Sequence, residues 1–95
     1  MREKTIENRL KIEVERIGGK AWKLTCPGVN GVPDRLIILP GGRIIFIELK
    51  APGGLTSFIQ KHRLKELSDL GCEVLCIDSI EKVMILMEGI KSEIL

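Results

Sequence analysis

Three charged residues, Asp34, Glu48 and Lys50, interrupt the most apolar part of this 95-residue chain. Carboxylate oxygens are ligands that Mg²⁺ and Mn²⁺ prefer, and a lysine beside them can orient a water molecule or stabilise negative charge that develops on phosphorus. Two carboxylates left unpaired in an apolar sheet would repel each other at considerable cost. If the fold brings them together, these residues therefore indicate metal-assisted hydrolysis of a phosphodiester bond.

The apolar segments that carry these charges are 36–39 and 44–47, and Pro40-Gly41-Gly42 separates them. Aliphatic, largely β-branched runs on either side of a proline and glycine turn predict a β-hairpin. Both faces of this hairpin are apolar, so we expect the sheet to be covered by other elements above and below.

The length of the loop decides whether the two carboxylates meet. A two-residue loop would place Asp34 and Glu48 on opposite faces, because neighbours in a strand alternate between faces. A three-residue loop pairs Leu39 with Arg43 and sets Asp34 directly across from Glu48. We expect this second register, because the proline suits a type I turn and the last glycine suits the left-handed residue after it. Lys50 would then point to the same face as Glu48.

The residues around these charges resemble a known family. Pro33-Asp34 followed by Glu48-Leu49-Lys50 resembles the signature of the PD-(D/E)XK nuclease superfamily, which has the restriction-endonuclease-like fold. A longer pattern resembles the stand-alone form of the VRR-NUC family, found in phages, prophages and bacteria, and it covers nearly the whole chain. This pattern consists of Gly31-Val32-Pro33-Asp34, Glu48-Leu49-Lys50-Ala51-Pro52-Gly53, Gln60 and Gly71.

The resemblance implies a metal-dependent nuclease with Mg²⁺ as its cofactor and Mn²⁺ as a substitute. In such a site Asp34, Glu48 and the backbone carbonyl of Leu49 bind the metal, and Lys50 serves catalysis. The resemblance also implies a homodimer that acts on branched DNA in the manner of a Holliday junction resolvase.

Two more residues complete such sites by resemblance. One is Gln60, which lies on the inward stripe of its predicted helix and would hold either the catalytic water or Lys50. The other is an acidic residue of the first helix, for which we favour Glu7 as a further metal ligand. Glu3 lies one turn away on the same face and is the alternative.

Hydrophobic periodicity and turn residues predict seven elements in the order α-β-β-β-α-β-α. The crossover between the last two strands should make them parallel, which gives an α/β fold with a mixed four-stranded sheet flanked by helices. The predicted segments are a helix over 3–17, strands over 21–26, 36–39 and 44–50, a helix from Thr56 or Ser57 to about Leu70, a strand over 73–77 and a last helix from about Ile80.

Several basic residues are candidates to contact DNA phosphates. Lys23 and Arg35 flank the glycine-containing loop 26–31, and Lys61 and Arg63 belong to a basic run, 61–65, on the second predicted helix. Ordinary surface charge is the alternative for each of them. No sequence-reading module is present, so we expect selectivity to come from DNA shape.

Composition bounds the remaining features. The chain is expected to form a single domain over 1–95, and its net charge of +2 does not decide the partner. No apolar stretch of about 18 residues and no signal peptide are evident, so we expect a cytoplasmic protein without a membrane partner. The three cysteines, Cys26, Cys72 and Cys76, lack paired spacing and are expected to pack in the core. The last helix carries more apolar residues than one face needs, which could seat a second subunit.

Two other interpretations stay open at this point. The chain could be an accessory module that binds branched DNA without cutting it, although such a module has no need of two repelling carboxylates. Alternatively, Asp34, Glu48 and Lys50 could form a cross-strand ion-pair cluster only, in which case Asp34→Asn would leave metal affinity unchanged.

Overall fold

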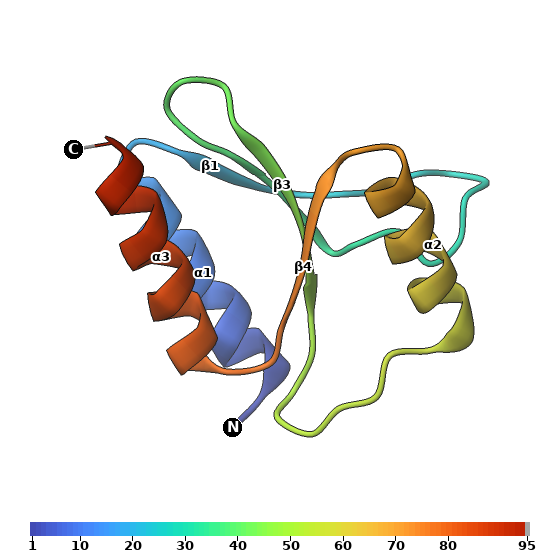
Figure 1. Ribbon diagram of the computed structural model, residues 1–95. Coiled ribbons are helices and arrows are strands. Elements are labelled where there is room, and N and C mark those ends of the chain that lie inside the picture. The colour runs from blue at the N-terminus through green and yellow to red at the C-terminus, as the bar shows by residue number, and fades with distance from the viewer. Residues whose placement is uncertain (95) are drawn as a thin grey trace.

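The structure, a computed structural model, describes residues 1–94, and the predicted order α-β-β-β-α-β-α is confirmed (Figure 1). The elements are α1 (Glu3–Arg16), β1 (Lys20–Lys23), β2 (Arg35–Ile38), β3 (Ile44–Leu49), α2 (Phe58–Asp69), β4 (Glu73–Ile77) and α3 (Ile80–Ile94).

The four strands form one mixed sheet in the order β1-β2-β3-β4. β1, β2 and β3 are antiparallel neighbours, and α2 connects β3 to the parallel strand β4, as predicted. The crossover therefore leaves β3 in the interior of the sheet, where its side chains have neighbours on both sides.

The register of the hairpin is the one that the three-residue loop predicts. Arg35 pairs with Ile47, and the Leu39 N–H donates to the Arg43 carbonyl over 2.9 Å. The turn itself is type II rather than the predicted type I, because Gly41 at its third position has a φ of +92°. Only glycine adopts this conformation without strain, so the first glycine of the loop is required as well as the last.

One face of the sheet is covered by two helices. α1 and α3 lie side by side across it (Figure 1). The odd-numbered residues of β2 and β3 point into this layer, where Ile37, Ile45 and Ile47 are fully buried. The rest of the core comes mainly from the two helices: Ile6, Leu10, Val14, Val83, Met87 and Ile90.

The other face is only partly covered, so the prediction of a sheet buried on both sides is wrong for this half. α2 packs at the β4 edge and has no fully buried residue of its own. Leu36 and Phe46 are consequently half-buried, and Ile44 is 47% exposed. We call these three residues the open sheet patch.

Two smaller expectations differ from the structure. β1 ends at Lys23, and it buries Ala21 while Trp22 lies in solvent, because the layer under β1 is formed by α1. None of the cysteines belongs to the core, since Cys26 and Cys72 are half-buried and Cys76 is exposed. The apolar surplus of α3 does reach solvent at Ile85.

Within residues 1–94, no helix combines the length and the apolar character that a membrane crossing requires.

Candidate active site

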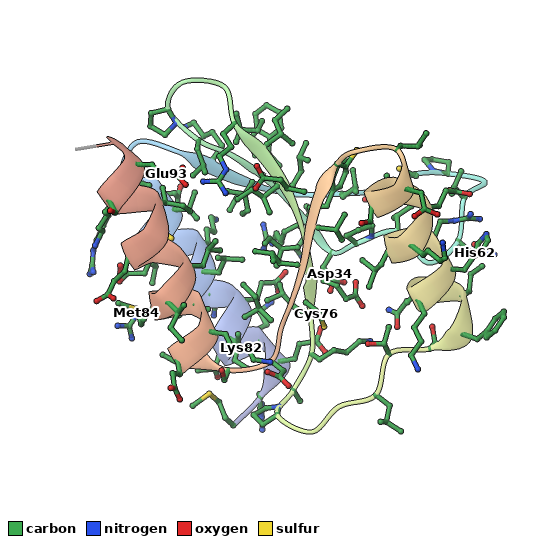
Figure 2. All side chains as sticks on the ribbon, viewed as in Figure 1. Asp34, His62, Cys76, Lys82, Met84 and Glu93 are labelled. Atoms are coloured by element: carbon green, nitrogen blue, oxygen red, sulfur yellow. The ribbon has the colours of Figure 1, made fainter. Side chains whose placement is uncertain are left out.

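Asp34 and Glu48 meet on the partly covered face of the sheet. Continuing the register by one step beyond the Arg35 and Ile47 pair sets Asp34 across from Glu48. The Asp34 carboxylate reaches β3, where it accepts a hydrogen bond from the Leu49 N–H over 2.7 Å. Figure 2 shows Asp34 on the side of β4 that faces α2. The hairpin thus holds the two acidic side chains together without help from any other element.

Glu48 is the buried member of the pair. Its side chain is 1% exposed, and neither carboxylate oxygen has a hydrogen-bond partner among the described residues. Lys50 Nζ lies 3.3 Å from Glu48 Oε2, close enough for an ion pair but without the alignment of a hydrogen bond. Burial and, secondly, the Asp34 charge raise the pKa of Glu48 to about 7, against the opposing effect of Lys50.

An unpartnered buried carboxylate of this kind fits a divalent cation. Buried polar atoms nearly always have a partner, and oxygen-only sites of one or two carboxylates suit Mg²⁺. No group of three or more acidic, cysteine or histidine side chains within residues 1–94 could hold a metal ion. A metal here would therefore need ligands besides the Asp34 and Glu48 side chains, namely backbone carbonyls, water or substrate.

The Leu49 carbonyl is available for that purpose because its strand partner is a proline. The bond from Leu39 to Arg43 marks the hydrogen-bonded pairs of the hairpin, which recur every second residue and would include Leu49 and Pro33. Proline has no N–H, so Pro33 cannot donate to the Leu49 carbonyl. The Leu49 N–H donates to the Asp34 carboxylate instead, and the Leu49 carbonyl receives no hydrogen bond from Pro33 across the hairpin.

Gln60 holds the lysine. Lys50 Nζ donates to Gln60 Oε1 at 2.9 Å, so of the two predicted roles for Gln60 the structure shows contact with Lys50. The same oxygen accepts the Ser57 N–H at 3.0 Å, and Ser57 Oγ in turn accepts the Gln60 N–H at 3.3 Å. This reciprocal pair is a capping box that starts α2. The first turn of α2 and the position of Lys50 therefore depend on one amide oxygen.

Glu7 is not brought to the carboxylate pair. Its carboxylate accepts Arg35 Nε at 2.8 Å, and Arg35 also donates to the Ala21 carbonyl at 2.8 Å. Arg35 follows Asp34 directly and so points to the opposite face of the sheet, toward α1. Two predicted roles are corrected as a result: Glu7 neutralises Arg35 instead of facing the metal ligands, and Arg35 is buried and not available to DNA phosphate. Glu3, the alternative to Glu7, is exposed.

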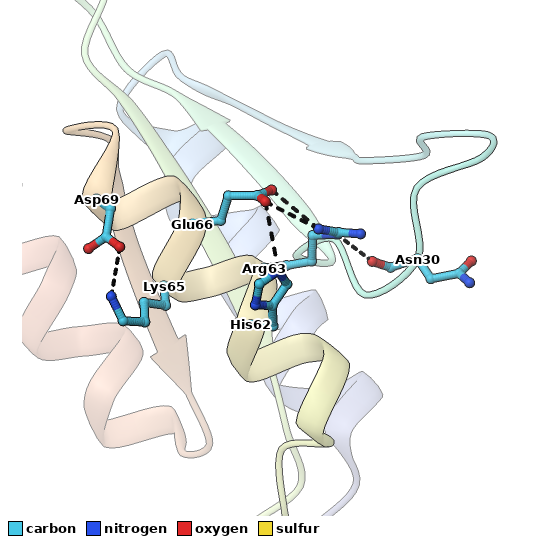
Figure 3. A network of polar contacts seen from close by, with 6 residues as sticks. All are labelled: Asn30, His62, Arg63, Lys65, Glu66 and Asp69. Carbon is cyan, nitrogen blue, oxygen red and sulfur yellow. Dashed lines mark hydrogen bonds and ion pairs between the residues drawn. The ribbon is translucent and has the colours of Figure 1, made fainter.

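The basic run on α2 is partly neutralised by its own helix (Figure 3). Arg63 pairs with Glu66, and Lys65 Nζ lies 2.7 Å from the Asp69 carboxylate. Lys61 is exposed and forms no ion pair with any residue of 1–94, and Lys23 is likewise exposed at the end of β1. Of the four predicted DNA contacts, these two lysines keep a free charge.

Arg63 has a second role that helical spacing does not indicate. Its Nε donates to the Asn30 carbonyl at 2.7 Å, which ties α2 to the loop before Asp34 (Figure 3). Gly31 lies in the same contact: its φ is +78°, and an added Cβ would come within 2.9 Å of the Ile59 carbonyl. The glycine of the Gly31-Val32-Pro33-Asp34 string was the one signal in the sequence of this close approach.

Known proteins resemble this chain in sequence and in structure. It is 48% identical over 79 residues to a protein named "Putative nuclease p44" of Acyrthosiphon pisum secondary endosymbiont phage 1, which covers 83% of this chain and 85% of that protein. A solved structure described as a VRR_NUC domain matches with a TM-score of 0.85 and 31% identity, covering 90% of this chain and 94% of that one. No family sequence model matches the chain.

Proposed function

This chain belongs to the VRR-NUC family of nucleases, and from that membership we propose that it is a Mg²⁺-dependent, structure-selective DNA endonuclease that acts on branched DNA in the manner of a Holliday junction resolvase. The observation that carries the proposal is the buried, unpartnered carboxylate of Glu48 beside Asp34 and Lys50.

Asp34, Glu48 and the Leu49 carbonyl would hold the metal ion, with water and a phosphate oxygen of the substrate as the other ligands. A divalent ion bound there supplies a Lewis acid beside the phosphodiester and lowers the pKa of bound water. Mn²⁺ should substitute, because the same oxygen ligands suit it.

Lys50 would act on the phosphate or on the attacking water. Its ammonium group has three donors, and Gln60 Oε1 and the Glu48 carboxylate engage it on the protein side. The side chain is still 16% exposed, so a donor can reach a phosphate oxygen as negative charge develops on it. Gln60 fixes the direction of that donor and does not itself contact the reacting atoms.

The substrate would be held through its backbone. Of the four predicted DNA contacts, Lys23 and Lys61 are the exposed cations that would supply phosphate contacts, which carry no sequence information. Selectivity for branched DNA would then depend on the shape and deformability of the junction.

A homodimer would suit a symmetric junction, because two active sites related by a twofold axis can cut two strands. The open sheet patch is the surface that we assign to the second subunit, since it is an apolar strand surface that α2 leaves uncovered. Ile44→Lys should therefore shift the protein to monomer in sedimentation equilibrium, whereas Ile85→Lys on α3 should not. The opposite result would move the interface to α3, as the apolar surplus of that helix predicts.

Cleavage of a labelled four-way junction, compared with linear duplex, flapped and single-stranded DNA, tests the proposal. We expect cutting with Mg²⁺ or Mn²⁺, none with EDTA, and none for Glu48→Gln. That variant should fold and still bind the junction, as tightly or more tightly, because one repulsion with phosphate is gone. Cutting that persists in Glu48→Gln would contradict the assignment of the site.

Tight binding of the junction without cutting in either metal would instead favour the non-cleaving accessory module. The cross-strand ion-pair interpretation is tested by calorimetric titration of Mn²⁺ into Asp34→Asn. We expect metal affinity to be lost, whereas a simple ion-pair cluster would leave it unchanged.

A further inference from the structure

The entrance to α2 carries two large apolar side chains in solvent. Leu55 is 90% exposed and Phe58 is 88% exposed, more than any other large hydrophobic residue described. Single exposed apolar residues are ordinary, but two of this size, three positions apart and almost free of protein contact, form a protruding apolar feature.

The two residues between them anchor the protrusion. Thr56 is half-buried. Ser57 is fixed by the capping box with Gln60. Thr56 is thus turned toward the protein and Ser57 is fixed at the start of α2, while Leu55 and Phe58 on either side of them extend into solvent.

The protrusion shares the first turn of α2 with Gln60, the residue that contacts the catalytic lysine. Gln60 Oε1 accepts both the Ser57 N–H, over 3.0 Å, and Lys50 Nζ, over 2.9 Å. Phe58 directly follows Ser57, so two hydrogen bonds connect its turn to Lys50. DNA whose phosphate lies at Lys50 would have its nearby bases within reach of this turn.

The charges around the protrusion also suit DNA. The first turn of α2 contains no acidic residue, and the exposed Lys61 follows one position after Gln60. Acidic residues of α2 occur only farther along, at Glu66 and Asp69. Phosphates can therefore approach the start of the helix more easily than its end.

We propose that Leu55 and Phe58 form a wedge that inserts between unstacked bases at the branch point of the DNA. The wedge rests on the proposed function and adds to it a physical basis for selecting branched substrates. A stacked linear duplex must be unstacked before an apolar side chain can enter, whereas a branch already offers base faces that are open. Lys61 is exposed three positions after Phe58 and the first turn of α2 has no acidic residue, and this positive charge favours a polyanion such as DNA over a second copy of the chain as the occupant.

The test measures binding in a Glu48→Gln background, so that the DNA remains uncut. We compare the parent with versions that also carry Leu55→Ala and Phe58→Ala, on a four-way junction and on linear duplex of the same sequence. Ile85→Ala, which shortens an exposed side chain of α3, is the matched control. Junction affinity should fall about 10-fold in the double substitution, in line with the loss of an aromatic side chain that stacks on a base. Duplex affinity and the control should stay within about twofold.

A second readout follows the bases themselves. A 2-aminopurine placed at the branch should change its fluorescence when the parent binds, and this change should be lost with Leu55→Ala and Phe58→Ala at saturating protein. Equal losses of affinity on junction and duplex, an unchanged fluorescence response, or dissociation of a dimer by the two substitutions would each overturn the wedge.

The two proposals fail in distinguishable ways. If the unmodified protein cuts junctions and the wedge variants keep its preference for junction over duplex, the wedge alone is wrong. If the unmodified protein neither cuts nor binds any of these DNAs, the proposed function is wrong and the wedge falls with it.

Discussion

The two sides of the sheet are held together by different forces. Toward α1 and α3 the contacts are mainly apolar, apart from the ion pair between Arg35 and Glu7, and residues such as Leu10 and Ile45 are fully buried. On the α2 side the helix buries no residue completely, and specific polar contacts connect it to the rest of the protein. These run from Gln60 to Lys50 and from Arg63 to the Asn30 carbonyl. The difference implies that one side carries the stability of the domain while the other positions the site.

The sharpest test of this division is a core substitution. Leu10→Ala should lower the free energy of unfolding by about 2–5 kcal/mol, the usual cost of a buried leucine. Cleavage per folded molecule should not change, because Leu10 touches none of the site. Urea unfolding and a cleavage assay at low temperature measure the two effects. Leu70→Ala at the exposed end of α2 is the control and should stay within about 0.5 kcal/mol of the parent. Similar losses in the free energy of unfolding from both substitutions would contradict the proposed difference between the two sides of the sheet.

The free energy of unfolding of the metal-free protein should depend on pH because of Glu48, which lies on the side of the sheet that carries the site. Glu48 has a pKa of about 7 when folded, compared with 4.5 ordinarily, so the folded protein binds this proton more tightly than the unfolded chain. The free energy of unfolding should therefore decrease as pH rises from 4.5 to about 7, by at most about 1.4 kcal/mol per pH unit. Unfolding in EDTA at several pH values measures the slope. Glu48→Gln should remove this decrease, and a slope that survives in that variant would assign the effect to another group.

Gln60 has two roles on the α2 side of the sheet, because it positions Lys50 and takes part in the capping box of α2. Gln60→Ala should lower the cleavage rate by about 10- to 100-fold, the range found when a residue that orients a catalytic group is removed. Stability should fall by only about 1 kcal/mol, through the lost cap. Gln60→Glu keeps the acceptor oxygen and should retain more of the rate. If the rate fell only in proportion to the folded fraction, Gln60 would be a helix cap and nothing more.

The smallest effects are expected at the free surface cations. Lys61→Ala should weaken DNA binding a few-fold and reduce the slope of log affinity against log salt by about 0.9, the value for one lost phosphate contact. Arg63→Ala should leave that slope unchanged, because its guanidinium already bonds Asn30 and Glu66. Binding measured at several salt concentrations separates the two, and identical slopes for both variants would return Arg63 to the set of phosphate contacts.

Much of this site was predictable because it is local to one hairpin. The loop length alone set Asp34 against Glu48, and the alternation of strand residues placed Lys50 beside them. The spacing of Gln60 along its helix indicated an inward position, which the bond to Lys50 confirms.

The incorrect expectations about the site mostly concern which layer lies on which face of the sheet. Alternation places Arg35 opposite to Asp34, but the sequence does not say that α1 and its Glu7 cover the Arg35 side. For the same reason the half-open sheet was not foreseen, since apolar composition does not reveal how far α2 reaches. Long-range pairing such as Arg63 with Asn30 leaves no periodic signal at all.

The amide oxygen of Gln60 has a consequence for how this protein can vary. It accepts hydrogen bonds from Lys50, from the Ser57 backbone and from the Ser57 hydroxyl. Asparagine is too short to reach the lysine from the same helical position, and glutamate would add a negative charge beside Glu48. Each local opening of the first turn of α2 also releases the lysine, so faster hydrogen exchange at that turn should accompany slower DNA cutting. The N-terminal end of this helix is therefore both a structural boundary and the most constrained point of the polar network.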